Sequence, residues 1–447
     1  MQKPLETGHS EWIYEGLGGQ MMKYSVDTYR LYQSEKYFAH TVRIHVRMKE
    51  EVDINVLDKA VNSAIGRYPY FAVRVTVDED GGYVLVPNSK KIAVITTADK
   101  MPMVGSSSIN DHLLFVDCSG KDIYFNISHT MCGGRGFQPW VMTNIYEYVR
   151  LKYNVEPDAP EIRKADSDLL PGETDEPSMD MLTTEEPISK RKIRKAPVLG
   201  MDYLKGVFIP VKRNPNYFVV TVDQKDLLKV AKGNDSSVLS LFFVLFARTL
   251  DKVFPAKDRF IVGEAAHNPR ESFGLPNTHC DFLSHVYVDY DRDSLNGDLE
   301  KLGTKTRGQI ILQTDPTVSH AQVRKLFEQY EEIDKVHGLK AKRKYMAKHS
   351  LSTGKDAQHG SFIANYTGLM DWGELADYVE WFVFVIEGHF TVEITAMADK
   401  IYVGFMQIIK TDKYIDLFRE ELEKLGISCT VEGPFPKRLP KHEIPVK

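Results

Sequence analysis

The spacing of apolar residues first becomes regular at residues 54–66, where it predicts an amphipathic helix. The apolar positions follow the i, i+3, i+4, i+7, i+8 pattern and are Leu57, Ala60, Val61, Ala64 and Ile65. Asp53 stands at the N-cap position, and Pro69 ends the helix because it has no backbone N–H to donate. Residues 71–77 and 83–86 then predict two strands joined by a turn at 78–82.

A second predicted hairpin leads into a loop rich in glycine. Its strands cover residues 113–116 and 123–128. The loop that follows reads Ser128-His129-Thr130-Met131-Cys132-Gly133-Gly134-Arg135-Gly136, and we expect a helix to begin near Phe137. The sequence therefore places a histidine where a strand ends, beside residues with little side-chain bulk.

Residues 154–200 interrupt the regular pattern. They are rich in Pro, Asp, Glu and Lys, which predicts a linker or a long surface crossover. The basic run at 190–195 lies inside this segment. We interpret it as a solvated run of charge, and contact with a phosphate-bearing donor is the alternative interpretation.

The second half of the chain repeats the mixture of strands and helices. The expected strands cover residues 217–222, 260–266, 284–290, 362–367, 390–396 and 401–409. The expected helices cover 225–232, 237–253 and 412–425, with mostly helical sequence from about 291 to 349. We predict an α+β fold of two halves, each with mixed sheet and flanking helices. The predicted division is 1–153 for the first half, 154–205 for the linker and 206–447 for the second half.

Composition narrows the class of protein. The 447 residues include 43% hydrophobic and 27% charged residues, and the net charge is -5, so a general nucleic-acid binder is disfavoured. Four cysteines without paired spacing do not form a disulfide framework and fit a reducing cytoplasm. The N-terminus lacks the apolar core of a signal peptide. The longest apolar run, 238–247, is shorter than the roughly 20 residues that cross a bilayer, so we expect a buried helix and a cytoplasmic protein.

The chemistry available at His129 is proton transfer. An imidazole has an ordinary pKa of about 6.5 and can remove a proton from a hydroxyl or an amine near neutral pH. Gly133 and Gly134 would let a substrate approach the backbone closely. The helix after Gly136 directs free N–H groups toward the loop, where they could bind an anion. A structural role for His129 is the alternative, since many histidines at strand ends have one.

The loop resembles the H-x-x-x-D-G-x-G signature of the condensation-domain superfamily. That superfamily includes chloramphenicol acetyltransferase, peptide-synthetase condensation domains and alcohol acetyltransferases, and the chain looks most like the last of these. The signature histidine falls on His129, the basic catalyst by resemblance. The signature glycines fall on Gly134 and Gly136. Gly133 stands where the family has an aspartate, which puts the rigidity of the loop in doubt.

Other segments support the resemblance by their order along the chain. Arg67-Tyr68-Pro69 resembles the element that ends the family's early helix. Asn268-Pro269-Arg270 resembles its N-x-R segment, so Arg270 is the candidate for the arginine that pairs with the missing aspartate. Glu271 and Asp281 are possible substitute partners for Arg270. Residues 365–368 and 371–373 resemble the family's later strand end.

The resemblance implies an acyltransferase with two chloramphenicol-acetyltransferase-like halves and an active-site tunnel between them. An acyl thioester of CoA or of a carrier protein would be the donor, and a small alcohol or amine would be the acceptor. No metal, bound cofactor or covalent acyl-enzyme is implied, and we expect a monomer. The candidates to line the tunnel or bind the oxyanion are Gly133, Gly134, Asn365, Tyr366 and Thr367, and Arg270 is the candidate structural support.

Three other interpretations remain open. Cys132 lies three residues after His129 and could serve as a nucleophile. A zinc site would need distant residues to converge, namely His129, Cys132, His267, His279 and Cys280, and their spacing is not typical of zinc. A phosphate-binding P-loop is not among them, because the loop lacks the P-loop sequence pattern. The replacement at Gly133 also leaves a binding protein without catalytic activity as the alternative function.

Overall fold

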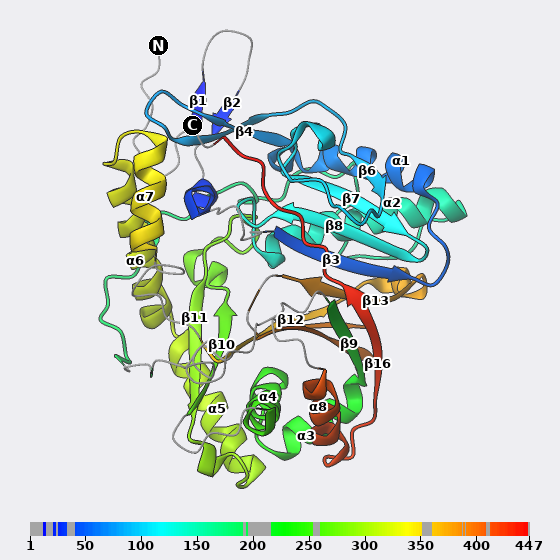
Figure 1. Cartoon of the computed structure of the whole chain (residues 1–447), viewed down its shortest axis with the longest axis vertical. Coiled ribbons are helices and arrows are strands. Elements are labelled where there is room, and N and C mark those ends of the chain that lie inside the picture. The colour runs from blue at the N-terminus through cyan, green and yellow to red at the C-terminus, as the bar shows by residue number, and fades with distance from the viewer. Residues whose placement is uncertain are drawn as a thin grey trace.

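The computed structural model describes residues 12–14, 21–23, 26–33, 41–190, 194, 216–253, 260–350, 360–386, 388, 390–407 and 412–445. Most of the described chain forms two lobes, each built around one main sheet (Figure 1). Parts of the basic run predicted at 190–195 lie outside these residues. Within the described part, no helix is both long enough and apolar enough to cross a membrane.

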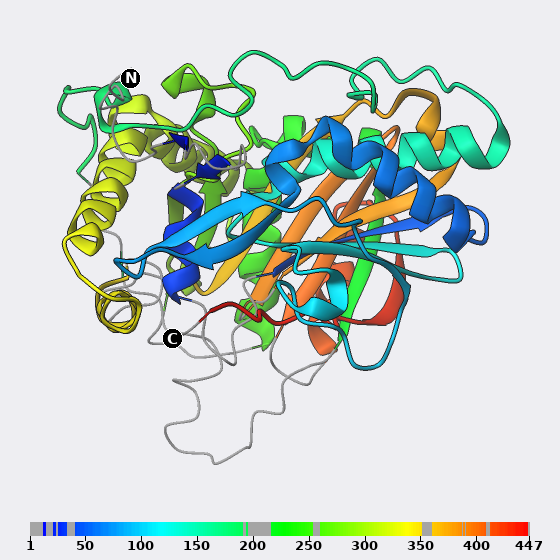
Figure 2. The same cartoon turned by 90° about the horizontal axis from the view of Figure 1, so that it is seen from above.

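The N-terminal lobe contains a five-stranded sheet in the order β13-β3-β8-β7-β6. The strands are β3 (Thr41–Met48), β6 (Val94–Thr96), β7 (Leu114–Ser119), β8 (Asp122–Ser128) and β13 (Val379–Val385). Two helices pack together on one face of this sheet (Figure 2), and these are α1 (Ile54–Ala64) and α2 (Gly134–Tyr153). Asp53 caps α1 as predicted, because its carboxylate accepts from the backbone N–H groups of Asn55 and Val56.

A second, four-stranded sheet has the order β1-β2-β5-β4. Its strands are β1 (Trp12–Tyr14), β2 (Met21–Lys23), β4 (Val73–Val77) and β5 (Tyr83–Pro87). The hairpin of β4 and β5 matches the two strands predicted at 71–77 and 83–86. The short 3-10 helix η1 (Val26–Gln33) lies beside this sheet and contributes Arg30 to the site described below.

The C-terminal lobe contains a seven-stranded sheet in the order β11-β10-β12-β14-β15-β9-β16. The strands are β9 (Asn216–Asp223), β10 (Ile261–His267), β11 (Ser284–Tyr290), β12 (Phe362–Met370), β14 (Phe390–Met397), β15 (Lys400–Gln407) and β16 (Cys429–Pro436). Helices cover the face that points away from the N-terminal lobe (Figure 1). They include α3 (Gln224–Gly233), α4 (Val238–Val253), α5 (Leu299–Thr314) and α8 (Lys413–Glu423).

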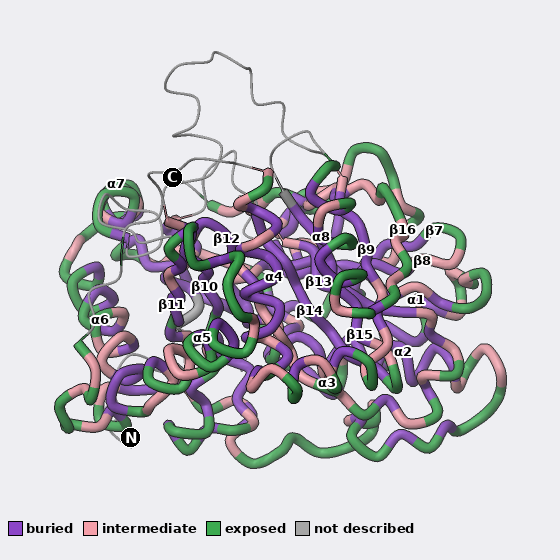
Figure 3. The backbone as a smooth tube through the Cα atoms, turned by 90° about the horizontal axis from the view of Figure 1, so that it is seen from below, coloured by how far each residue is buried: buried purple, intermediate pink, exposed green. Residues whose placement is uncertain are grey.

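The apolar run predicted as a buried helix is α4. Its side chains are buried on nearly all sides because α4 lies between the sheet and neighbouring helices, in the purple centre of Figure 3. Two further helices, α6 (Pro316–Asp334) and α7 (Leu339–His349), extend the C-terminal lobe toward η1 and β5. The α+β class with mixed sheets and flanking helices is confirmed.

Strand β13 connects the two lobes. It lies between β12 and β14 in sequence, and those two strands are parallel neighbours in the C-terminal sheet. The chain therefore leaves that sheet, pairs antiparallel with β3 of the other lobe, and returns. Thr395 donates to the Phe382 carbonyl at 2.6 Å, and Tyr402 donates to the Glu380 carbonyl at 3.0 Å. These bonds fix the two sheets relative to each other.

Helix α2 begins at Gly134, earlier than the predicted start near Phe137. Gly133 is its N-cap residue, and the carbonyl of Gly133 accepts from the N–H groups of Gly136 and Phe137. Glycine suits an N-cap although it offers no side-chain acceptor. The glycine loop is thus shorter than predicted, and the helix N-terminus lies closer to His129.

Candidate functional site

His129 lies directly after β8, at the side of the N-terminal sheet that meets the other lobe. Strand β8 pairs with β3 up to the register Thr41 opposite Ser128, so the backbone before His129 is fixed. The side chain of His129 is 28% exposed. Burial lowers the pKa of its imidazole, and the charge of Arg30 lowers it further. The ring is therefore mostly neutral at pH 7 and able to accept a proton.

Two charged side chains lie close to the Nδ1 atom of His129. Arg30 Nη1 lies 3.2 Å from Nδ1, and Asp281 Oδ2 lies 3.4 Å from it. Arg30 Nη1 also forms an ion pair of 2.6 Å with Asp281 Oδ2, and the Asp281 side chain is fully buried. Burial raises the pKa of the Asp281 carboxyl, but the charges of Arg30, His129 and Arg270 outweigh burial and hold this pKa below its ordinary value. Asp281 is therefore an anion at neutral pH.

The glycines of the loop are close to protein side chains. A Cβ atom on Gly133 would lie 2.5 Å from Asp281 Oδ1, and one on Gly134 would lie 3.0 Å from the ring of Phe384. We expected Gly133 and Gly134 to admit a substrate to the backbone. Asp281 and Phe384 fill the space on the side of each Cα where a side chain would project, and the approach of a substrate to this backbone stays a prediction.

The segment before Asp281 packs against the start of α2. A Cβ atom on Gly136 would overlap the carbonyl oxygen of His279, so only glycine allows this approach. Arg270 fixes the backbone of the same segment, because it donates through Nε to the Thr278 carbonyl at 2.9 Å and through Nη2 to the Cys280 carbonyl. Arg270 also donates to Asn268 at 2.8 Å.

The C-terminal segment closes the other side of the loop. His442 Nε2 lies 2.7 Å from Ser128 Oγ, and Thr41 donates to the Pro440 carbonyl at 2.7 Å. Burial lowers the pKa of His442 to about 4, so this imidazole is neutral at pH 7. The residue before His129 is thus held by a neutral partner from the end of the chain.

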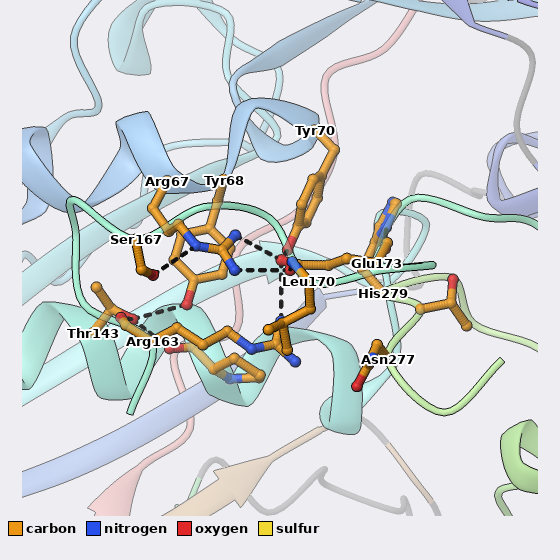
Figure 4. Close-up of polar contacts among 12 residues, drawn as sticks. Arg67, Tyr68, Tyr70, Thr143, Arg163, Ser167, Leu170, Glu173, Asn277 and His279 are labelled. Atoms are coloured by element: carbon orange, nitrogen blue, oxygen red, sulfur yellow. Dashed lines mark hydrogen bonds and ion pairs between the residues drawn. The ribbon is translucent and has the colours of Figure 1, made fainter. Parts of the chain in front are cut away.

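A cavity of about 850 Å³ opens beside the loop. It lies where α2, residues 157–170 of the crossover segment (154–190) and residues 276–279 meet. Gly136 and His279 line it, and His129 is not among its lining residues. Arg67 and Glu173 form a buried bidentate pair at its edge, at 2.9 and 2.8 Å (Figure 4). Tyr70 also donates to the Glu173 carboxylate, at 2.5 Å. This pair anchors the crossover to the N-terminal lobe.

The three candidate residues on β12 do not form a single surface. Asn365 accepts from the Ala266 N–H at 2.9 Å and donates to Glu393 at 2.7 Å. Thr367 donates its hydroxyl hydrogen to the Ile394 carbonyl at 3.3 Å. Tyr366 points to the other face of the strand and packs against the C-terminal core. Thr367 is thus already engaged with the backbone, and Tyr366 faces away from the N-terminal lobe.

Comparison with solved structures identifies the fold. The structure superposes on the trichothecene 15-O-acetyltransferase TRI3 of Fusarium sporotrichioides with a TM-score of 0.60 and 11% identity, over 95% of this chain and 99% of that one. It also matches TRI101 of F. graminearum in complex with coenzyme A and deoxynivalenol, with a TM-score of 0.52 and 12% identity over 90% and 98%. The first condensation domain of the CDA synthetase matches with a TM-score of 0.51 and 11% identity over 90% and 93%.

The chain has the two-lobed fold of the condensation-domain and acetyltransferase superfamily. No family model matches the sequence, and no curated protein matches it either. The predicted two-lobed architecture is therefore confirmed as a fold. The roles of individual residues rest on the geometry described above.

Sequence reasoning proposed His129 and Arg270 as site residues, which stays a prediction, and it did not anticipate the side chains that contact His129. Arg30 belongs to no recognisable motif, and its short helix carries no strong period. Asp281 was considered only as a partner for Arg270, whereas its carboxylate lies beside Nδ1 of His129. The signal that could have pointed to Asp281 was the missing carboxylate at Gly133.

The alternatives that used cysteine or zinc receive no geometric support from the contacts around the loop. Cys132 is fully buried in the core of the N-terminal lobe. Cys280 Sγ and His279 Nε2 are 4.0 Å apart. Among the residues with a described position, no three His, Cys, Asp or Glu side chains are grouped to hold a metal ion.

Proposed function

We propose that this chain transfers an acyl group from a thioester of CoA or of a carrier protein to a hydroxyl or amine acceptor, with His129 as the general base. One observation carries the proposal. A mostly neutral imidazole lies at the end of β8, partly exposed, with its Nδ1 side held by protein groups. With the imidazole hydrogen on Nδ1, facing the Asp281 carboxylate, Nε2 is the nitrogen that accepts a proton from the acceptor.

The chemical step conserves every atom. The acceptor O–H or N–H transfers its proton to His129 Nε2 as its oxygen or nitrogen forms a bond to the thioester carbonyl carbon. The tetrahedral intermediate then collapses, the C–S bond breaks, and the proton on Nε2 passes to the leaving thiolate. No redox partner or metal ion is required by this step.

The relatives by fold support the same class of reaction. TRI3 is described as an O-acetyltransferase, and TRI101 was solved with coenzyme A and deoxynivalenol. We propose an acyl-CoA or an acyl-phosphopantetheine as donor here, and a small molecule as acceptor. The cavity beside the loop lies within the size range of small-molecule sites, so it is a candidate to admit one of the two substrates.

The test is a thiol-release assay with acetyl-CoA and a panel of alcohols and amines, with the products identified by mass spectrometry. His129→Ala is expected to lower acceptor-dependent turnover by at least roughly 10²-fold, the usual contribution of general base catalysis. The matched control is His337→Ala, because the His337 side chain is 83% exposed. Equal turnover by His129→Ala and by the control would refute the role of His129.

Cys132→Ser provides a second discrimination. We expect this variant to retain most of the activity, because the proposed mechanism has no covalent acyl-enzyme. A folded Cys132→Ser protein without activity would support the nucleophile interpretation instead.

One contact favours a second candidate function, a binding protein without turnover. If Arg30 Nη1 donates to His129 Nδ1 across the 3.2 Å between them, the imidazole hydrogen lies on Nε2, and this nitrogen cannot act as a base. Binding of acetyl-CoA by calorimetry, combined with no product from any acceptor, is the result expected of that function.

A further inference from the structure

We propose that Asp281, from the C-terminal lobe, supplies to the histidine loop the carboxylate that would otherwise stand at Gly133, and that it is the positioning residue for His129. This inference rests on the proposed function for its catalytic meaning. The juxtaposition itself does not depend on any substrate. A carboxylate that reaches the loop from a distant segment takes the place of one built into the loop.

The first support for the proposal is shape. A Cβ atom on Gly133 would lie 2.5 Å from Oδ1 and 2.9 Å from Cγ of Asp281. These distances are shorter than real Cβ contacts, so a side chain at position 133 and the Asp281 carboxylate exclude each other. The two positions compete for one space, and Asp281 occupies it.

The second support is charge. Asp281 Oδ2 is 2.6 Å from Arg30 Nη1 and 3.4 Å from His129 Nδ1, and the carboxylate is fully buried. A buried carboxylate beside Nδ1 favours the tautomer that carries its hydrogen on Nδ1, which leaves Nε2 free to accept a proton. The same carboxylate forms an ion pair with Arg30 Nη1, which lies within hydrogen-bonding distance of Nδ1 and competes for it, so the charge on Asp281 decides which tautomer prevails.

The third support is the way the backbone before Asp281 is held. Arg270 donates to the carbonyls of Thr278 and Cys280. The N–H of His279 donates to the Glu173 carbonyl at 3.1 Å, and the Thr278 hydroxyl donates to the Asp175 carbonyl. The crossover and Arg270 thus fix the segment from two sides. This explains why Arg270 remains useful although no aspartate stands at position 133.

The decisive experiment follows the tautomer of His129 by ¹⁵N NMR of histidine-labelled protein. The chain has 14 histidines, so the His129 signal is assigned by its loss in His129→Ala. We expect the hydrogen on Nδ1 in the unsubstituted protein and on Nε2 in Asp281→Asn, in which Arg30 is freed from the carboxylate. The matched control is Asp416→Asn, a substitution at a side chain 67% exposed on α8, and it should leave the signal unchanged.

Two rescue variants separate a positioning role of Asp281 from a general structural effect of its substitution. The double variant G133D/D281G moves the carboxylate into the loop and should restore the hydrogen to Nδ1. Arg30→Met introduced into Asp281→Asn should also restore it, since the competing donor is gone and the amide oxygen introduced at position 281 can accept from Nδ1–H. Should the exchange variant fail to fold, the Arg30→Met pair decides the question alone. An Asp281→Asn protein with an unchanged tautomer, or a folded rescue variant that keeps the hydrogen on Nε2, would overturn the proposal.

Turnover of acetyl-CoA distinguishes this inference from the proposed function. We expect Asp281→Asn to lower kcat by roughly 10²-fold with a smaller effect on KM, and either rescue to recover most of this loss. If the tautomer responds as described but turnover is absent in every protein, Asp281 still positions His129 and the acyl-transfer function fails. If turnover is present and Asp281→Asn leaves both kcat and the tautomer unchanged, the positioning role fails.

Discussion

The close contact between Gly136 and the backbone of His279 makes Gly136→Ala a sharp test of how the two lobes meet at the site. A Cβ atom at position 136 would overlap the His279 carbonyl oxygen and lie 3.0 Å from the Cβ of Cys132. The carbonyl belongs to a segment held by Arg270 and by the crossover. Since this backbone is tied on both sides, it cannot move away without breaking hydrogen bonds.

The expected change in the free energy of unfolding of Gly136→Ala combines two opposing contributions. Alanine in place of glycine inside a helix stabilises by about 1 kcal/mol. Overpacking against a fixed neighbour costs about 1–3 kcal/mol, and displacement of a hydrogen-bonded backbone places Gly136→Ala at the upper end of this range. We therefore expect a net loss of about 1–2 kcal/mol in the free energy of unfolding.

Gly308→Ala is the matched control in α5. No heavy atom lies within 4 Å of a Cβ atom built at position 308, so only the helix propensity acts, and the variant should gain up to about 1 kcal/mol. Differential scanning calorimetry of both variants should give melting temperatures that move in opposite directions. A Gly136→Ala protein as stable as Gly308→Ala would refute the tight packing of His279 on the loop.

Two further predictions concern buried carboxylates. Glu173→Gln removes the charge that pairs with Arg67 and should lower the free energy of unfolding by about 3 kcal/mol, measured by urea titration. The control is Glu332→Gln, at a side chain 55% exposed, which should change this free energy by less than about 0.5 kcal/mol. Burial raises the pKa of Glu393 to about 8, so the folded protein keeps a proton that the unfolded chain loses near pH 4, and stability should fall as the pH rises between these values. Glu393→Gln keeps the amide neighbour Asn365 but cannot ionise, and its melting temperature between pH 5 and pH 8 should fall less than that of the unsubstituted protein; parallel curves would contradict this assignment.

Elements with a strong local period were the ones that the sequence predicted well. The helix at 54–66 and the strand at 284–290 are present as α1 and β11, because each buries one continuous stripe or face. Strand β3 was not anticipated, although it is central in the N-terminal sheet. Its sequence Thr41-Val42-Arg43-Ile44-His45-Val46-Arg47-Met48 places apolar residues at every second position. All three basic residues of the strand contact aspartates of β7 or β8 in the same sheet.

The crossover illustrates why the rest could not be predicted. Residues 154–190 have little regular structure, and their polar composition suggested a solvated linker. The structure buries Glu173 among Arg67, Tyr70 and Arg163. A buried ion pair between residues more than a hundred positions apart leaves no periodic signal, because either partner alone looks like an exposed charge.

Contacts between residues distant in sequence also explain why the surroundings of His129 were not predicted. His129 was recognised because its neighbours in sequence resemble a known signature, and the motif places it correctly at the end of β8. The side chains that contact its imidazole come from η1 and from the segment before β11. The space that the absent side chain leaves open can be reached by a carboxylate from the other lobe, and Gly133 is then a requirement for Asp281 to bind there. Under this reasoning, glycine at position 133 and aspartate at position 281 form one unit, and a side chain at position 133 should be tolerated only when Asp281 is replaced by a smaller residue.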